Sequence, residues 1–239
     1  MLTFPPSWEG KTTLVVLAAG SGRRFGESSV AKHLAEIDGV PIVVRLLKQF
    51  VDAFSSEPLL VVNREDTHTA EVLQTWDVGA RIVFQGDGKG TVAAMLAALP
   101  YSSEILCVVL GDLVIEGRFL GLADRHPAIA VWPNGPQSAV RANYGVEVEG
   151  STIVRIVEKP SRPAGLVCGM GVYLLHADHI RSFARNVAPD GRSERGVTDL
   201  LAAIISGDGT LSSVAFEGLY VNVNRQSDLA DAASALGLA

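Results

Sequence analysis

Short apolar runs of strand length alternate with longer helical patterns through the first half of the chain. The runs "TLVVLA", "PLLVV", "RIVF" and "EILCVVLGD" are separated by "PIVVRLLKQFVDAF", "TAEVLQTW" and "TVAAMLAAL", whose apolar residues have helical spacing. A repeated order of strand and helix predicts βαβ units and therefore a parallel sheet. Ligands of such a sheet bind beyond the carboxyl ends of its strands, so the loops at these ends are candidate sites.

The second half of the chain has a different pattern. "YGVEVEG" and "TIVRIVE" alternate apolar and polar residues, which predicts two half-exposed strands in a hairpin around Gly150 and Ser151. "GVYLLHADHIRSF" runs from a strand into a helix, and the last helix, "SDLADAASALGLA", has Ser227 as its predicted N-cap. No linker or repeat interrupts the sequence. We therefore expect one α/β domain over 1–239, a three-layer sandwich around a mostly parallel mixed sheet.

Composition and charge exclude several classes of protein. The formal net charge is −6 and no run of Lys or Arg is present, which argues against a nucleic-acid-binding protein. The N-terminal "MLTFPPSWEGKTT" lacks the pattern of a signal peptide, and no apolar run is long enough to span a bilayer. The prediction is a cytoplasmic protein without a membrane partner. Cys107 and Cys168 lie in apolar strand runs and are expected to be buried free thiols.

The stretch "VVLAAGSGRRFG" has the composition of a phosphate-binding turn. Its spacing differs by one residue from the dinucleotide fingerprint, because Phe25 stands where the third glycine belongs and the next glycine is Gly26. "GDGKGT" superficially resembles a P-loop, but Gly90 separates the lysine from the threonine. Neither a dehydrogenase nor a P-loop kinase is therefore favoured. The histidines show no convincing ligand spacing.

The longer phrase "LAAGSGRRFGESSVAKHLAEIDGVPIV" resembles the signature of sugar-phosphate nucleotidyltransferases, in particular of members that use pyrimidine nucleotides. In that signature, L-A-A-G-x-G-x-R precedes P-K-x-L and G-x-P, and this chain departs from it by having Ala31 before the lysine. The resemblance implies a Rossmann-like fold with a nucleotide-binding half over roughly 12–115 and an acceptor-binding half over 116–239. It also implies that Arg24 and Lys32 bind the triphosphate. The loop residues implied to face the phosphates are Leu17, Ala18, Ala19, Gly20, Ser21 and Gly22.

The resemblance continues to the end of the chain and assigns the rest of the nucleotide and metal site. "QGDGKGTVAAMLAAL" implies that Gln85, Gly90 and Thr91 bind the nucleotide, with Gln85 and the Gly90 backbone on the base. "CVVLGDLV" places Asp112 at the end of a strand, and "GLYVNVNRQSDLADA" places Asn222 in the closing segment of the family. Asp112 and Asn222 are thus the implied protein ligands of Mg²⁺, the expected cofactor.

Three further segments imply the acceptor site. "NYGVEVEGSTIVRIVEKP" supplies Gly145, Glu158 and Lys159, with Lys159 on the phosphate of the acceptor. "CGMGVYLL" has Gly169 where several relatives have an Asn that contacts the C2 substituent of a sugar, which weakens a reading as an N-acetylglucosamine 1-phosphate enzyme. "SERGVTDLL" supplies Thr198 near the acceptor.

The implied reaction transfers a nucleotidyl group from an NTP to a sugar 1-phosphate or a similar phosphorylated small molecule and releases pyrophosphate. A phosphate dianion attacks without a general base, which agrees with the lack of a candidate base. Three alternatives stay open: a cytidylyltransferase for a non-sugar phosphoester or phosphonate, a molybdenum-cofactor nucleotidyltransferase, and a degenerate module that binds nucleotide sugars and regulates a partner. The nucleobase, the acceptor and the choice between monomer and homo-oligomer are also left open.

Overall fold

The computed structural model describes residues 12–20, 31–120, 127–186, 195–207 and 209–238. Their backbone forms one ten-stranded sheet and a separate two-stranded ribbon. The predicted Ser21, Gly22 and Arg24 lie outside the described residues. Within these ranges, no helix is long and apolar enough to cross a membrane.

The first half of the sheet is parallel, as the alternation of apolar runs and helices predicts. Its strand order is β5-β4-β1-β6, and all three pairings are parallel. The strands are β1 (Thr12–Leu17), β4 (Leu59–Val62), β5 (Arg81–Phe84) and β6 (Ile105–Leu110). The connecting helices are α1 (Ile42–Phe50), α2 (Thr69–Thr75) and α3 (Thr91–Ala98). Between β1 and α1 lie a 3-10 turn at Lys32–Leu34 and the ribbon of β2 (Glu36–Ile37) and β3 (Val40–Pro41).

The second half of the sheet is largely antiparallel, so the sheet is mixed as predicted, but the predicted parallel order applies to its first half and not to most of the sheet. The long strand β11 (Val167–His176) pairs antiparallel with β6 and with β8 (Ala128–Trp132), and β8 runs parallel to β12 (Ser212–Asn222). The remaining strands are β7 (Leu113–Leu120), β9 (Tyr144–Glu149) and β10 (Thr152–Glu158). The helices of this half are α4 (Gln137–Ala142), α5 (Ala177–Asn186), α6 (Val197–Ser206) and α7 (Ser227–Ala235).

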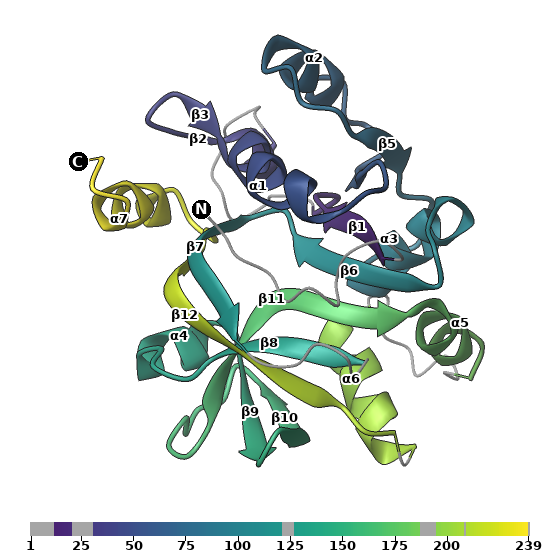
Figure 1. The fold of residues 1–239 in the computed structure, drawn as a ribbon, viewed down its shortest axis with the longest axis vertical. Coiled ribbons are helices and arrows are strands. Elements are labelled where there is room, and N and C mark those ends of the chain that lie inside the picture. The colour runs from purple at the N-terminus through teal and green to yellow at the C-terminus, as the bar shows by residue number, and fades with distance from the viewer. Residues whose placement is uncertain (1–11, 21–30, 121–126, 187–194, 208, 239) are drawn as a thin grey trace.

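Helices cover both faces of the sheet and produce the predicted three layers (Figure 1). Alternate residues of β1 point to opposite faces: Leu14 and Val16 belong to the core that contains the apolar side of α1, including Leu47. Val15 and Leu17 belong to the core on the other face, which includes Met95 of α3 and residues of α5 and α6. Because β1 is buried on both faces, its sequence is a continuous apolar run rather than an alternating one.

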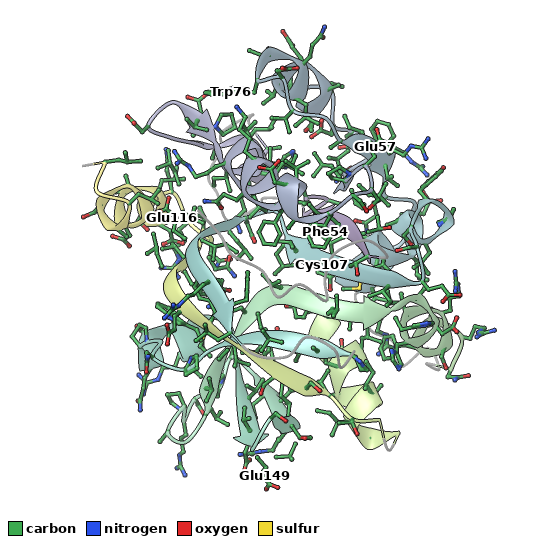
Figure 2. All side chains as sticks on the ribbon, viewed as in Figure 1. Phe54, Glu57, Trp76, Cys107, Glu116 and Glu149 are labelled. Carbon is green, nitrogen blue, oxygen red and sulfur yellow. The ribbon has the colours of Figure 1, made fainter. Side chains whose placement is uncertain are left out.

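Several local predictions can be compared with the structure. The hairpin of β9 and β10 and the passage from β11 into α5 are confirmed. Cys107 and Cys168 are buried free thiols, as predicted, and Cys107 is labelled within the sheet in Figure 2. The prediction of Ser227 as an N-cap is wrong, because Ser227 is the first residue of α7. The Asp228 carboxylate, in the first turn of α7, accepts hydrogen bonds from the Asn224 and Arg225 amides and so holds the segment that leads into the helix.

Candidate active site

Two adjoining cavities lie on the sheet where β1 and β6 end. The first has a volume of about 730 Å³ and is lined by the ends of β1 and β6, the Lys32 turn and the start of α3. The second, of about 1010 Å³, lies over the antiparallel half and is lined by residues of β9, β11 and β12 and the start of α6. Thr91, Leu110 and Asp112 line both cavities. Asp112 therefore stands at the boundary between them.

The first cavity brings together the nucleotide-binding residues predicted within the described ranges. These lining residues are Leu17, Ala18, Ala19, Gly20, Lys32, Gln85, Gly90, Thr91 and Asp112. The Gln85 Nε2 donates to the Gly88 carbonyl at 2.6 Å and to the Gly90 carbonyl at 3.5 Å. Since both carbonyls accept, the Gln85 Oε1 is the end of the amide that is left to read a donor on a ligand.

The backbone conformation at position 90 requires glycine. Its φ of +86° lies in the left-handed region, and a Cβ at this position would meet the Arg195 backbone carbonyl. The Val92 amide, in the first turn of α3, donates to the same carbonyl at 3.3 Å. Gly90 therefore fixes how the start of α3 meets the segment before α6, where the two cavities join.

Asp112 and Asn222 lie next to each other at the end of one strand ladder. Leu113 pairs with Asn222 in the β7–β12 ladder, and the Val223 amide donates to the Asp112 carbonyl at 2.9 Å. Lys32 reaches this point from the first half, with its Nζ 2.5 Å from the Asp112 Oδ2 and 3.3 Å from the Asn224 Oδ1. The Lys32 side chain thus contacts both Asp112, which is 80 positions later in the sequence, and Asn224.

Two side-chain oxygens at this place are buried without a hydrogen-bond partner among the described residues. They are the Asp112 Oδ1 and the Asn222 Oδ1. A buried oxygen without a donor is costly unless a ligand satisfies it. Carboxylate and amide oxygens are hard ligands of the kind that Mg²⁺ binds, usually with phosphate oxygens and water completing its shell. The residues present therefore fit a hard divalent cation.

The second cavity contains three of the predicted acceptor residues. Glu158, Lys159 and Thr198 line it, and the Thr198 hydroxyl donates to the Glu158 Oε2 at 2.9 Å. The Lys159 Nζ lies 3.7 Å from the Glu158 Oε1, and both side chains are more than half exposed. Lys159 has a φ of +43°, which is unusual for a residue with a side chain, and its amide donates to the Asn143 carbonyl at 2.9 Å. This conformation turns the chain at the end of β10 beside the cavity.

The structure does not bring the other two predicted acceptor residues, Gly145 and Gly169, to the cavity wall. A Cβ on Gly145 would meet the side chains of Leu166 and Val140, and a Cβ on Gly169 would meet the Tyr144 ring. Close packing accounts for glycine at both positions, since Gly145 lies against α4 and the residue before β11, and Gly169 lies against Tyr144 of β9.

Three tyrosines that the sequence analysis did not single out also line the second cavity. Tyr144, Tyr173 and Tyr220 come from three different strands, and burial raises the pKa of each phenol. The Tyr144 hydroxyl donates to the Met170 carbonyl at 2.7 Å. A signal for Tyr220 was present, because it stands two positions before Asn222 on one strand and therefore on the same face.

His33 lines the first cavity and is buried, with 4% of its surface exposed. Its Nε2 lies 2.7 Å from the Thr69 hydroxyl, which in turn donates to the Asp66 Oδ2 at 2.8 Å. Burial lowers the pKa of His33 to about 4, against a smaller opposing effect of Asp66. The neutral imidazole therefore donates to Thr69 and ties the Lys32 turn to the start of α2. No ligand spacing in the sequence pointed to this histidine, and the contacts of its side chain give it a structural role.

Comparison with known proteins finds relatives that match most of the chain. Bifunctional protein GlmU of Leifsonia xyli subsp. xyli is 30% identical over 246 residues, which cover 93% of this chain and 49% of GlmU. UTP–glucose-1-phosphate uridylyltransferase AglF of Haloferax volcanii is 24% identical, over 90% of this chain and 92% of AglF. This chain thus spans about half the length of the GlmU relative and nearly the whole of AglF.

Comparison with solved structures supports the fold. The inositol-1-phosphate CTP transferase from T. maritima superimposes with a TM-score of 0.78 at 17% identity, over 95% of both chains. This likeness confirms the predicted α/β fold class. The family described as "MobA-like NTP transferase domain" matches residues 14–194, which is most of the chain. The resemblance to nucleotidyltransferases is thereby confirmed, and the chain belongs to the MobA-like NTP transferase domain family.

Proposed function

We propose that this protein transfers a nucleoside monophosphate from an NTP to a phosphorylated small molecule and releases pyrophosphate. The observation that carries this proposal is the pair of buried, unpartnered oxygens on Asp112 and Asn222 at the boundary of the two cavities, beside Lys32. A cavity for each substrate with a cation site between them is the arrangement that a direct transfer between two phosphates requires.

In the proposed reaction, an oxygen of the acceptor phosphate forms a bond to the α-phosphorus of the NTP, and the bond from that phosphorus to pyrophosphate breaks. Lys32 and Arg24 bind the triphosphate and stabilise the charge that develops on the leaving pyrophosphate. Lys159 holds the acceptor phosphate in line. Mg²⁺, when bound by Asp112 and Asn222, would neutralise charge on the reacting phosphates. The nucleotide-binding half and the acceptor-binding half each contribute one wall of this arrangement.

The nucleotide is proposed to be a pyrimidine NTP. Support for a pyrimidine comes from the resemblance of the segment around Gln85 to members of the family that use pyrimidine nucleotides. Two backbone carbonyls hold the Gln85 Nε2, which leaves its Oε1 to accept from a donor on the base. Cytosine offers an amino group and uracil and thymine offer a ring N–H, so this single contact does not choose among the three bases.

The acceptor is proposed to be a sugar 1-phosphate or a similar polyhydroxylated phosphate. Support comes from the polar pair of Glu158 and Thr198 in the wall of the second cavity, because the hydroxyls of such an acceptor need hydrogen-bond acceptors of their own. A non-sugar phosphoester, a phosphonate and the molybdenum cofactor are the other acceptor classes. A regulatory module that binds nucleotide sugars without turnover is the alternative from a different class.

The test is a matrix of the five common NTPs against sugar 1-phosphates, inositol phosphate, phosphocholine and a phosphonate, with pyrophosphate release measured in the presence of Mg²⁺. We expect release with one pyrimidine NTP and one acceptor class, and no release without an acceptor. Binding of nucleotide sugars by calorimetry without release in any cell of the matrix would support the regulatory module and contradict the proposed activity.

A further inference from the structure

Asn143, between α4 and β9, stands between the cation site and the acceptor site. Its side-chain Nδ2 donates to the Ala139 carbonyl at 3.0 Å, and its Oδ1 accepts from the Asn222 Nδ2 at 2.8 Å. Two amide side chains thus form a chain of hydrogen bonds that begins at a helix carbonyl and ends in the candidate metal site.

The direction of this chain is fixed at its first member. A backbone carbonyl can only accept, so the Asn143 amide must turn its NH₂ toward Ala139 and its oxygen toward Asn222. Asn222 must then turn its own NH₂ toward Asn143. The remaining end of Asn222 is its Oδ1, which is the buried oxygen without a partner among the described residues.

We propose that Asn143 is a positioning residue that turns the Asn222 amide so that its oxygen faces the cation. This inference rests on the proposed function, because it assumes that Asn222 is a metal ligand. Without an acceptor at position 143, the Asn222 amide can rotate and present its NH₂, which a cation repels. Partners that orient metal ligands in this way commonly change metal affinity about 10- to 100-fold when they are removed.

Asn143 also contacts Lys159, the residue proposed to hold the acceptor phosphate. The Asn143 backbone carbonyl accepts from the Lys159 amide, at the position where Lys159 adopts its unusual positive φ. This second contact uses the backbone, so a side-chain variant at position 143 leaves it in place. The two functions of Asn143 can therefore be separated by mutagenesis.

Asn143 also explains why an amide and not a carboxylate stands at position 222. An Asp at position 222 would place an oxygen against the Asn143 Oδ1. Rotation of the Asn143 amide would relieve that repulsion only by placing its oxygen against the Ala139 carbonyl. The residues at 143 and 222 are thus matched in hydrogen-bond polarity.

The test is a double-mutant cycle read by binding of Mn²⁺ alone, titrated by electron paramagnetic resonance of free Mn²⁺. Asn143→Leu keeps the approximate size and removes the acceptor, and we expect Mn²⁺ affinity to fall about 10-fold or more. In the Asn222→Ala background the same substitution is expected to have no further effect, because the ligand it orients is absent. In the assay of pyrophosphate release, Asn143→Leu is expected to have a lower rate than the wild type, and high Mg²⁺ concentrations are expected to restore that rate.

A second variant guards against a simple folding defect. Asn143→Asp loses the donor to the Ala139 carbonyl, as Asn143→Leu does, but retains an acceptor for the Asn222 NH₂, so it is expected to bind Mn²⁺ better than Asn143→Leu. Wild-type affinity in Asn143→Leu, or an equal loss in the Asn222→Ala background, would overturn the inference. If Asn222→Ala itself binds Mn²⁺ as well as the wild type, it is the assignment of the metal site in the proposed function that fails.

Discussion

Replacement of Lys32 by Met tests the centre of the proposed mechanism, because it removes one cation and keeps the aliphatic stem. If Lys32 stabilises the charge that moves onto pyrophosphate, its loss should lower kcat about 10²- to 10³-fold, which corresponds to about 2.7–4 kcal/mol of transition-state stabilisation. The side chains of Lys32 and Asp112 keep 18% and 25% of their surface exposed. Loss of their ion pair should therefore cost about 1–2 kcal/mol of folding free energy, between the ~0–1 of an exposed pair and the ~3–5 of a buried one.

The same variant distinguishes a phosphate ligand from a mere partner of Asp112. Removal of Lys32 frees the Asp112 Oδ2, so Mn²⁺ affinity should stay the same or rise while turnover falls. Pyrophosphate release gives kcat, urea unfolding gives the folding free energy, and Mn²⁺ titration gives the metal affinity. Lys48→Met is the matched control, because Lys48, on α1, lies over the ring of Trp76 at the end of α2 and lines neither cavity. A kcat within tenfold of the wild type in a folded Lys32→Met protein would refute the assignment.

Three other perturbations have expected outcomes. Gly90→Ala should lower the free energy of unfolding, measured in urea, by about 1–3 kcal/mol, because Gly90 has a left-handed φ and a Cβ there would meet the Arg195 carbonyl. Gly86→Ala is the control and should be nearly neutral, because a Cβ on Gly86 would meet nothing within 4 Å. Equal stabilities of the two variants would contradict this account. His33 has a pKa near 4 against 6.5 unfolded, so the unfolded chain binds more protons and stability should fall by about 2–3 kcal/mol between pH 7 and pH 4.5. His33→Gln should remove most of this pH dependence, and the control His68→Gln should keep it. A pH dependence that persists in His33→Gln would show that another group is responsible. Thr198→Val should raise the KM for the acceptor several-fold and leave the KM for the NTP unchanged. A rise in the KM for the NTP instead would mean that Thr198 contacts the nucleotide and not the acceptor.

The parallel half of the fold was predictable because each of its strands is a local apolar run followed by a helical pattern. The antiparallel half was harder. β7 starts directly after Asp112 and pairs with β12, about a hundred residues later in the chain. No local sequence pattern predicts which strand β7 pairs with. Both buried oxygens of the candidate metal site depend on this long-range ladder.

The site shows the same division between local motifs and distant contacts. Lys32, Gln85 and Asp112 could be predicted as site residues because they stand in motifs with specific spacing, and the structure places all three around one cavity. Gly145 and Gly169 were predicted to lie at the acceptor site, and the structure adds a packing reason for glycine at both positions, which the sequence alone could not show because the neighbours are distant in the chain. Asn143 could not be found, because its partner Asn222 is 79 positions away.

The wall shared by the two cavities has a consequence for how this protein can acquire new substrates. Thr91, Leu110 and Asp112 face both cavities, so a substitution there alters both substrates at once and is hard to tolerate. Gln85 lines the first cavity and Thr198 the second, so variation at either position changes one preference alone. On the proposed assignment of the cavities to the NTP and the acceptor, the choice of base and the choice of acceptor are therefore separable traits, and directed evolution of one need not disturb the other.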